Sequence, residues 1–167
     1  MKLSLIKLRL YQILPLLSII VLILFENVSF NLFGFSQSYL TNVYAFIFFF
    51  AIFNTAVINI FTIFFLGILT DILLIFPLGL SVFLYCFVYF IGQFNQRSLR
   101  RGSFRAQWII YSLTMLFVFL FGLLFLNLVY GHIPHFFYLL TEFLVLICFY
   151  PIIAVFCGWI NRKMELS

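Results

Sequence analysis

The chain alternates between long apolar runs and short polar breaks. Between Glu26 and Arg97 the only charged residue is Asp71. A helix of about 20 apolar residues spans the hydrocarbon core of a bilayer, which is about 30 Å thick. The pattern therefore predicts an all-α integral membrane protein, organised as a single polytopic membrane domain over residues 1–167.

The basic residues set the expected number of crossings. They fall into three clusters, within residues 2–9, 97–105 and 162–163. Lys and Arg in short loops remain on the cytoplasmic side of a membrane, so the number of crossings between successive clusters must be even. About six transmembrane helices fit this rule, with the N- and C-termini cytoplasmic: 10–25, 40–55, 56–76, 79–95, 107–130 and 136–160.

Composition supports the same class. Hydrophobic residues make up 66% of the chain and charged residues 8%, whereas soluble domains carry about 25% charged residues. The net charge of +5 is explained by orientation in the membrane, so no nucleic-acid partner is expected. The connections are short, which leaves the bilayer and the loops at its surfaces as the only places for function.

Two boundaries need comment. The first apolar run follows a basic start, as in a signal peptide, but the residues after it, ENVSF, contain no small-x-small cleavage site, so an uncleaved first helix is expected. The turn predicted at Asn54 and Thr55 contains no basic residue, unlike the other inner connections.

The stretch GILTDILLIFPLGL contains the main candidate site. Gly67 and Asp71 are four residues apart, so they share a helix face that another helix can approach closely. Pro77 and Gly79 are expected to end this helix and start the next. A buried polar group needs a partner. We therefore expect Asp71 to accept a hydrogen bond from a backbone N–H at the start of the next helix or from the hydroxyl of Ser81.

Glu142 is a second acid expected inside the bilayer, at a depth similar to that of Asp71. Acids within membrane helices are functional candidates. Three interpretations stay open: a hydrogen bond between helices, an acid wetted by the headgroup region, or part of a proton or ion path. The outer half of the predicted bundle contains no Lys or Arg to pair with either acid.

Other polar residues give weaker indications. His132 and His135 have helical spacing for a metal, but Pro134 lies between them, which favours an interfacial turn. No nucleophile with a base in reach and no phosphate-binding loop is recognisable. The basic stretch 97–105 can contact anionic headgroups. The three cysteines are isolated in apolar runs without metal-binding spacing: Cys86, Cys148 and Cys157.

Several of these motifs resemble the rod shape-determining protein MreD family. That family has a Gly-Leu-Leu-x-Asp segment, an apolar spacer and Pro-Leu-Gly, matched here by residues 67–71 and 77–79. A basic loop followed by Phe and a Trp is matched by residues 96–108, and Tyr150-Pro151 is a weaker third match. The candidates for helix packing or partner contact are Gly67, Asp71, Pro77, Gly79, Trp108 and Glu142.

The resemblance implies a non-enzymatic component, without cofactors, of the cell-elongation complex in the bacterial inner membrane. Its implied partners are MreC and, through it, MreB, RodA and a penicillin-binding transpeptidase. The fold of the family is similar to that of the membrane substrate-binding subunits of energy-coupling-factor transporters. A subunit that binds a vitamin-type molecule is therefore the alternative function. One departure is the segment Phe53-Asn54-Thr55-Ala56, where many family members have an Arg-Pro-like turn; it leaves this turn without an anchoring charge.

Overall fold

The computed structural model describes residues 17–24, 40–54, 58–130 and 136–165. Within these ranges every regular element is a helix, which confirms the all-α prediction. Seven helices are present in this described part of the chain. Residues 17–24 form the first, and the others are α2 (Val43–Phe53), α3 (Ile60–Leu74), α4 (Leu80–Phe94), α5 (Gln96–Arg101), α6 (Phe104–Tyr130) and α7 (Phe136–Glu165).

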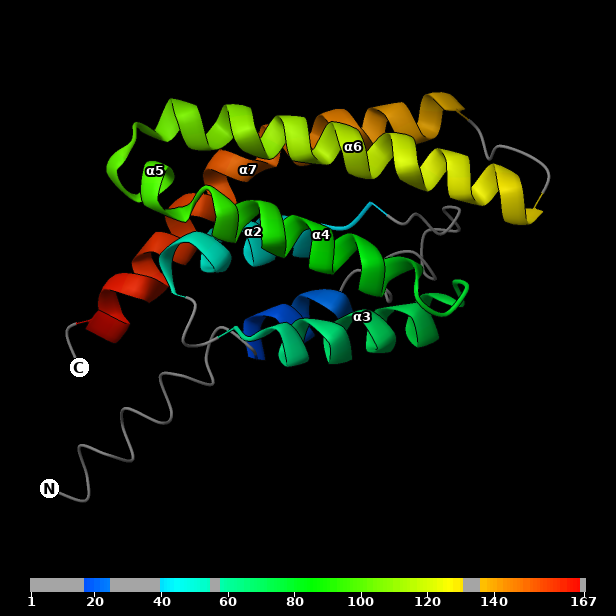
Figure 1. Ribbon diagram of the computed structural model, residues 1–167, viewed down its shortest axis with the longest axis horizontal. Helices are drawn as coiled ribbons and strands as arrows, with labels where there is room; N and C mark the ends of the chain where they lie inside the picture. Colours follow the sequence, from blue (N-terminus) through cyan, green and yellow to red (C-terminus); the bar gives the residue numbers. More distant parts are fainter. Residues whose placement is uncertain (1–16, 25–39, 55–57, 131–135, 166–167) are drawn as a thin grey trace, which may run out of the picture.

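The helices form a layered bundle around α2. In Figure 1, α6 and the first part of α7 form the upper layer, and α2 and α4 lie in the middle. The C-terminal part of α7 slopes down past α2, and α3 lies below with the helix of residues 17–24. The helix α2 contacts α4, α5 and α7. Every residue of α2 from Val43 to Ile52 is buried. A helix that is apolar on all sides is stable only where other elements surround it, which explains its central position.

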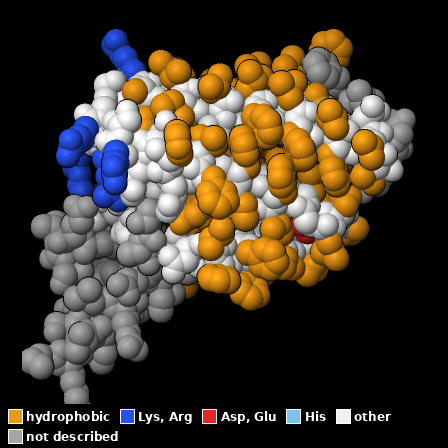
Figure 2. All heavy atoms as spheres, in the orientation of Figure 1, with side chains coloured by type: hydrophobic (Ala, Val, Ile, Leu, Met, Phe, Trp, Pro, Cys, Tyr) orange, Lys and Arg blue, Asp and Glu red, His pale blue; other side chains and the backbone are white. Residues whose placement is uncertain are grey.

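The two ends of the bundle differ in charge. The short helix α5 lies at one end together with the C-terminal end of α7, whereas the α3–α4 turn lies at the opposite end (Figure 1). Figure 2 shows the Lys and Arg side chains gathered at the α5 end and apolar side chains over much of the remaining visible face. The exposed apolar side chains include Phe61 and Phe65 of α3 and Leu113 and Leu128 of α6.

Among the described residues, two helices are long and apolar enough to cross a membrane. The qualifying segments are Phe104–Val129 in α6 and Leu139–Arg162 in α7. The helices α2, α3 and α4 contain 11, 15 and 15 residues. At about 1.5 Å per residue they are shorter than the hydrocarbon core of a bilayer. The described part of the chain therefore has two full-length candidate spans and three shorter apolar helices of 10–17 residues.

Several predicted boundaries need correction. The helix predicted over 56–76 begins at Ile60, because Asn59 has an extended backbone, with φ −95° and ψ 161°. It ends at Leu74, because Ile75 adopts the left-handed conformation with φ 55°. The helix predicted over 40–55 covers Val43–Phe53, and that predicted over 79–95 covers Leu80–Phe94.

The long helices extend further than predicted, and one helix is unexpected. The range 107–130 begins at Phe104, and 136–160 continues to Glu165. The basic stretch, predicted as a loop, contains α5, whose single buried residue Leu99 anchors it to the bundle. Of the helix predicted over 10–25, only residues 17–24 lie within the described part.

Candidate functional site

The carboxylate of Asp71 caps the start of α4. One of its oxygens accepts a hydrogen bond from the backbone N–H of Gly79 at 2.7 Å, and the other accepts one from the N–H of Ser81 at 2.9 Å. The first N–H groups of a helix have no partner within that helix, and Gly79 has no side chain to supply one. A carboxylate at this position is also favoured by the positive end of the helix dipole. Asp71, only 1% exposed, therefore provides from α3 the cap that α4 lacks.

The expected backbone donor is confirmed, and the role of Ser81 is corrected. The sequence left open whether Asp71 would bond a freed N–H or the Ser81 hydroxyl. Ser81 takes part through its N–H. Because a cap satisfies N–H groups of the first turn, the backbone rather than the side chain is the natural donor.

The same residue also closes the end of α3. The carbonyl oxygen of Asp71 accepts hydrogen bonds from the N–H groups of Ile75 and Phe76, the latter at 3.0 Å. The prediction that Pro77 ends the helix is wrong by two residues, because the left-handed Ile75 already turns the chain after Leu74. Asp71 consequently lies within the last turn of α3, nearer its end than predicted. We call the segment from Asp71 to Ser81 the Asp71 corner.

Gly67 allows α3 and α4 to approach closely beside this corner. A Cβ atom built on Gly67 would lie 2.6 Å from the Cα and 2.8 Å from the backbone nitrogen of Val82. Backbone atoms cannot move aside as a flexible side chain can, so any larger residue would separate the helices. The predicted shared face of Gly67 and Asp71 is therefore a real contact face, and it is directed at α4.

A buried hydroxyl cluster lies next to the corner and was missed by sequence reasoning. The hydroxyl of Tyr85 on α4 is 3.3 Å from the Thr70 hydroxyl on α3 and 3.3 Å from that of Thr41, just before α2. The Thr70 hydroxyl also donates to the carbonyl of Leu66 at 2.8 Å. Tyr85 lies one helical turn after Ser81, which was the available indication. The cluster links α3 and α4 to the segment that leads into α2.

The opposite end of the bundle contains a second capped terminus. The Arg100 guanidinium of α5 donates to the carbonyl of Ile52 at 2.6 Å and to that of Phe53 at 2.8 Å. These are among the last carbonyls of α2, which have no partner within the helix. A cation is also favoured at the negative end of the helix dipole. The expectation of a turn without an anchoring charge is therefore wrong, because Arg100 supplies the charge from a distant part of the chain.

Two further contacts reinforce this end. The Gln96 side-chain amide also donates to the Ile52 carbonyl, at 3.1 Å. The Asn54 amide donates to the side-chain oxygen of Asn161 on α7 at 3.2 Å. The end of α2 is thus held by both α5 and α7.

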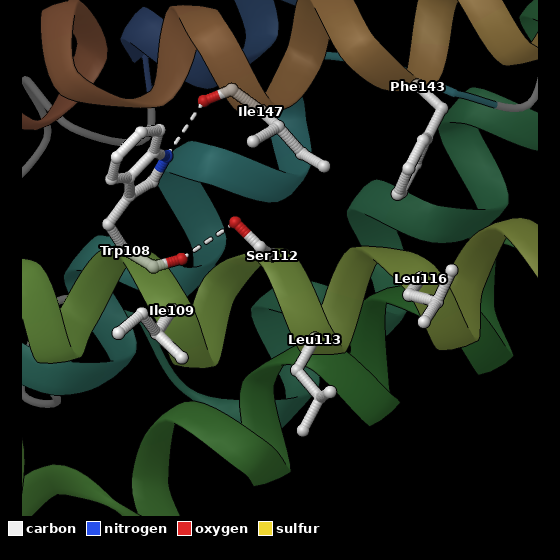
Figure 3. Close-up of a pocket in the computed structure, with 7 residues that line it drawn as sticks. All are labelled: Trp108, Ile109, Ser112, Leu113, Leu116, Phe143 and Ile147. Carbon is white, nitrogen blue, oxygen red and sulfur yellow. Dashed lines mark hydrogen bonds between the residues drawn. The ribbon is translucent and has the colours of Figure 1, made fainter.

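Trp108, near the start of α6, bonds to a carbonyl inside α7. Its indole N–H donates to the carbonyl of Ile147 at 3.0 Å (Figure 3). In an α-helix this carbonyl would accept from the residue four positions later, which is Pro151, and proline has no N–H. Trp108 therefore occupies the acceptor that the proline leaves open. Trp108, from the second match to the family, and Pro151, from the third, are therefore linked through the Ile147 carbonyl.

The remaining candidates are dispersed. Glu142 is partly buried on α7, which packs mainly against α2 and α6, so it belongs to a different helix pair from Asp71. His132 and His135 lie outside the described residues. Within the described ranges no group of three or more His, Cys, Asp or Glu is placed to hold a metal ion. The cysteines differ in environment, with Cys157 buried, Cys86 intermediate and Cys148 exposed.

The chain has no match among protein-family models, curated proteins or solved structures. Fold and site together define the class as an all-α bundle with two apolar helices of membrane-spanning length.

Proposed function

We propose that this chain is a six-span protein of the bacterial inner membrane, with both termini cytoplasmic, and a non-enzymatic component of the cell-elongation complex. In this role it supports peptidoglycan synthesis by contacting MreC and, through it, MreB, RodA and a penicillin-binding transpeptidase. The proposal combines the resemblance of the motifs with the arrangement of the bundle. The gathering of Lys and Arg at the α5 end supports that end as the cytoplasmic one (Figure 2).

The single observation that carries the proposal is the Asp71 corner. The strongest motif match contains Gly67, Asp71 and Gly79. Gly67 allows α3 and α4 to pack closely, and Asp71 accepts hydrogen bonds from the N–H groups of Gly79 and Ser81. Together these contacts fix α4 on α3. Both carboxylate oxygens of Asp71 accept hydrogen bonds from the protein backbone. Such a corner gives the bundle a fixed shape, which is what a binding partner in the membrane requires.

Depletion of the protein in its own host tests the function. The expected result is loss of rod shape, measured as increased cell width, together with co-purification of an MreC-type protein with the tagged chain. Re-expression of the parent chain should restore the width, and Asp71→Leu should restore it less well than Asp71→Asn. Unchanged cell dimensions, with no elongation protein recovered, would contradict the proposal. High-affinity vitamin uptake conferred by this gene would instead favour the transporter class.

A further inference from the structure

An apolar groove runs between α6 and α7. It has a volume of about 460 Å³ and opens to the exterior. Figure 3 shows the residues that line it. Ile109 and Leu113 are 66% and 69% exposed, so the groove is a surface feature rather than an internal cavity. Its principal lining residues are Trp108, Ile109, Leu113 and Leu116 of α6 and Phe143 and Ile147 of α7.

The polar groups in the groove are already satisfied by the protein. The Trp108 indole N–H bonds to the Ile147 carbonyl, and the Ser112 hydroxyl donates to the Trp108 carbonyl at 2.9 Å. The surface offered to an occupant is therefore formed by hydrocarbon and aromatic carbon. Water needs two or more polar partners to be held in such a site, so an apolar occupant is favoured.

A basic residue precedes the groove residues of α6 along the chain. Arg105 is exposed and lies three residues before Trp108 and four before Ile109 on the same helix. Residues with this spacing are neighbours on one helix face. Arg105 therefore continues the ridge of Ile109 and Leu113 toward the end of the bundle where α5 lies. An occupant that matches both features has an apolar chain and an anionic head.

The shape of the α6 face favours a lipid over a helix. Helices in membranes associate where small residues let their backbones approach. The exposed ridge of α6 carries Ile109, Leu113 and Leu116, which are large. Large side chains along the groove suit a flexible chain better than a second helical backbone.

We propose that this groove binds an anionic phospholipid, with one acyl chain along Ile109 and Leu113 and the phosphate at Arg105. The site rests on the membrane placement proposed above and not on the role in cell elongation. Basic residues near the cytoplasmic surface of a membrane attract anionic headgroups. The lipid would bridge α6 and α7 on the exterior, beside the internal bridge from Trp108.

Native mass spectrometry of the full chain in detergent tests the site, with phosphatidylglycerol and zwitterionic phosphatidylcholine titrated separately. The parent chain should bind phosphatidylglycerol more tightly. Arg105→Gln should weaken this binding by about fivefold, the effect of one basic contact at a membrane surface. Leu113→Trp, which fills the groove, should weaken binding of both lipids. Arg162→Gln is the matched control, since it removes a different exposed arginine, which lies on α7 rather than α6.

Three results would overturn the proposal. The first is equal affinity of the parent chain for the two lipids. The second is an equal loss of phosphatidylglycerol binding in Arg105→Gln and Arg162→Gln. The third is capture of a polypeptide, rather than lipid, by a photoreactive residue in place of Leu113 in intact cells. A depletion strain with normal cell shape would contradict the role in elongation and leave the lipid measurements unaffected.

Discussion

Trp108 donates its indole hydrogen bond to Ile147, at the carbonyl four residues before Pro151. The tryptophan near the start of α6 thereby supplies the hydrogen-bond donor that Pro151 of α7 lacks. The Ile147 carbonyl can accept a hydrogen bond from the Trp108 indole or from a backbone N–H at position 151. The two donors can therefore be tested together.

Trp108→Phe should therefore destabilise the protein, and the loss should depend on Pro151. In the parent chain the substitution leaves the Ile147 carbonyl without a donor, at a cost of about 0.5–1.5 kcal/mol in unfolding free energy. In a Pro151→Ala background the alanine N–H can bond the carbonyl, so the same substitution should cost much less. Thermal unfolding in detergent of the four variants of this cycle gives the coupling energy. Independent, additive effects would show that the indole does not serve this carbonyl.

Asp71→Asn should be milder than Asp71→Leu. Asparagine keeps one acceptor oxygen for the first turn of α4, whereas leucine leaves the N–H groups of Gly79 and Ser81 without their acceptors. We expect a loss of about 1 kcal/mol for asparagine and at least twice as much for leucine. The yield of folded protein and its melting temperature in detergent provide the measurement. If the melting temperature of the leucine variant equals that of the parent, the cap adds nothing to stability.

Alanine at the two motif glycines should destabilise for different reasons. Gly67→Ala forces its Cβ against the Val82 backbone and should cost about 1–3 kcal/mol through overpacking. Gly79→Ala meets no atom within 4 Å, but its φ of +106° is strained for any residue with a Cβ, at about 1–3 kcal/mol. Gly158→Ala is the control, because its nearest neighbour, Phe49, would be 3.9 Å away.

Combining Gly67→Ala with Asp71→Asn tests whether the close helix contact and the cap depend on each other. Gly67→Ala separates the helices and so already weakens the cap, which predicts less than additive losses for the double variant. A Gly158→Ala variant as unstable as Gly67→Ala and Gly79→Ala would show that the effect is common to any glycine of the bundle.

Arg100→Gln should loosen the end of α2 without changing orientation in the membrane. The variant loses the hydrogen bonds to the Ile52 and Phe53 carbonyls, an expected cost of about 1 kcal/mol because this end is partly exposed. The melting temperature of Arg100→Lys should lie between those of Arg100→Gln and the parent, since lysine keeps the charge but not the planar guanidinium group. Arg101→Gln removes a neighbouring charge and serves as the control. Equal melting temperatures for the Arg100 and Arg101 variants would contradict the cap.

Cysteine labelling tests the proposed topology. In a background without the native cysteines, cysteines replacing Ser98 and Ser167 should not react with a membrane-impermeant reagent in intact cells. They should react after the membrane is permeabilised, which controls for accessibility. Labelling of either position from outside would show that the six-span arrangement is wrong.

Sequence reasoning worked where the physical cause was local. A break after an apolar helix frees N–H groups a few residues away, so a backbone partner for Asp71 was predictable from the chain around it. The exact end of α3 was not, because it depends on the left-handed backbone of Ile75, a residue that rarely adopts that conformation.

Long-range contacts escaped sequence reasoning. Arg100 reaches Ile52 across a separation of 48 residues, and Trp108 reaches Ile147 across 39. Hydropathy describes which segments avoid water, but it contains no information on which side chain will meet which carbonyl. The clusters of basic residues indicated orientation, and the second role of Arg100 became visible only when the helices were placed together.

The capped end of α2 also sets an order of events during biosynthesis. When the last residue of α2 is added to the growing chain, neither Arg100 nor the α4, α5 and α7 helices that surround α2 have been made. At about 5–20 residues per second, translation needs several seconds to deliver Arg100. Throughout that interval the final carbonyls of α2 must accept hydrogen bonds from water or from the insertion machinery. The core helix is therefore among the first to be synthesised and among the last to gain all of its final contacts.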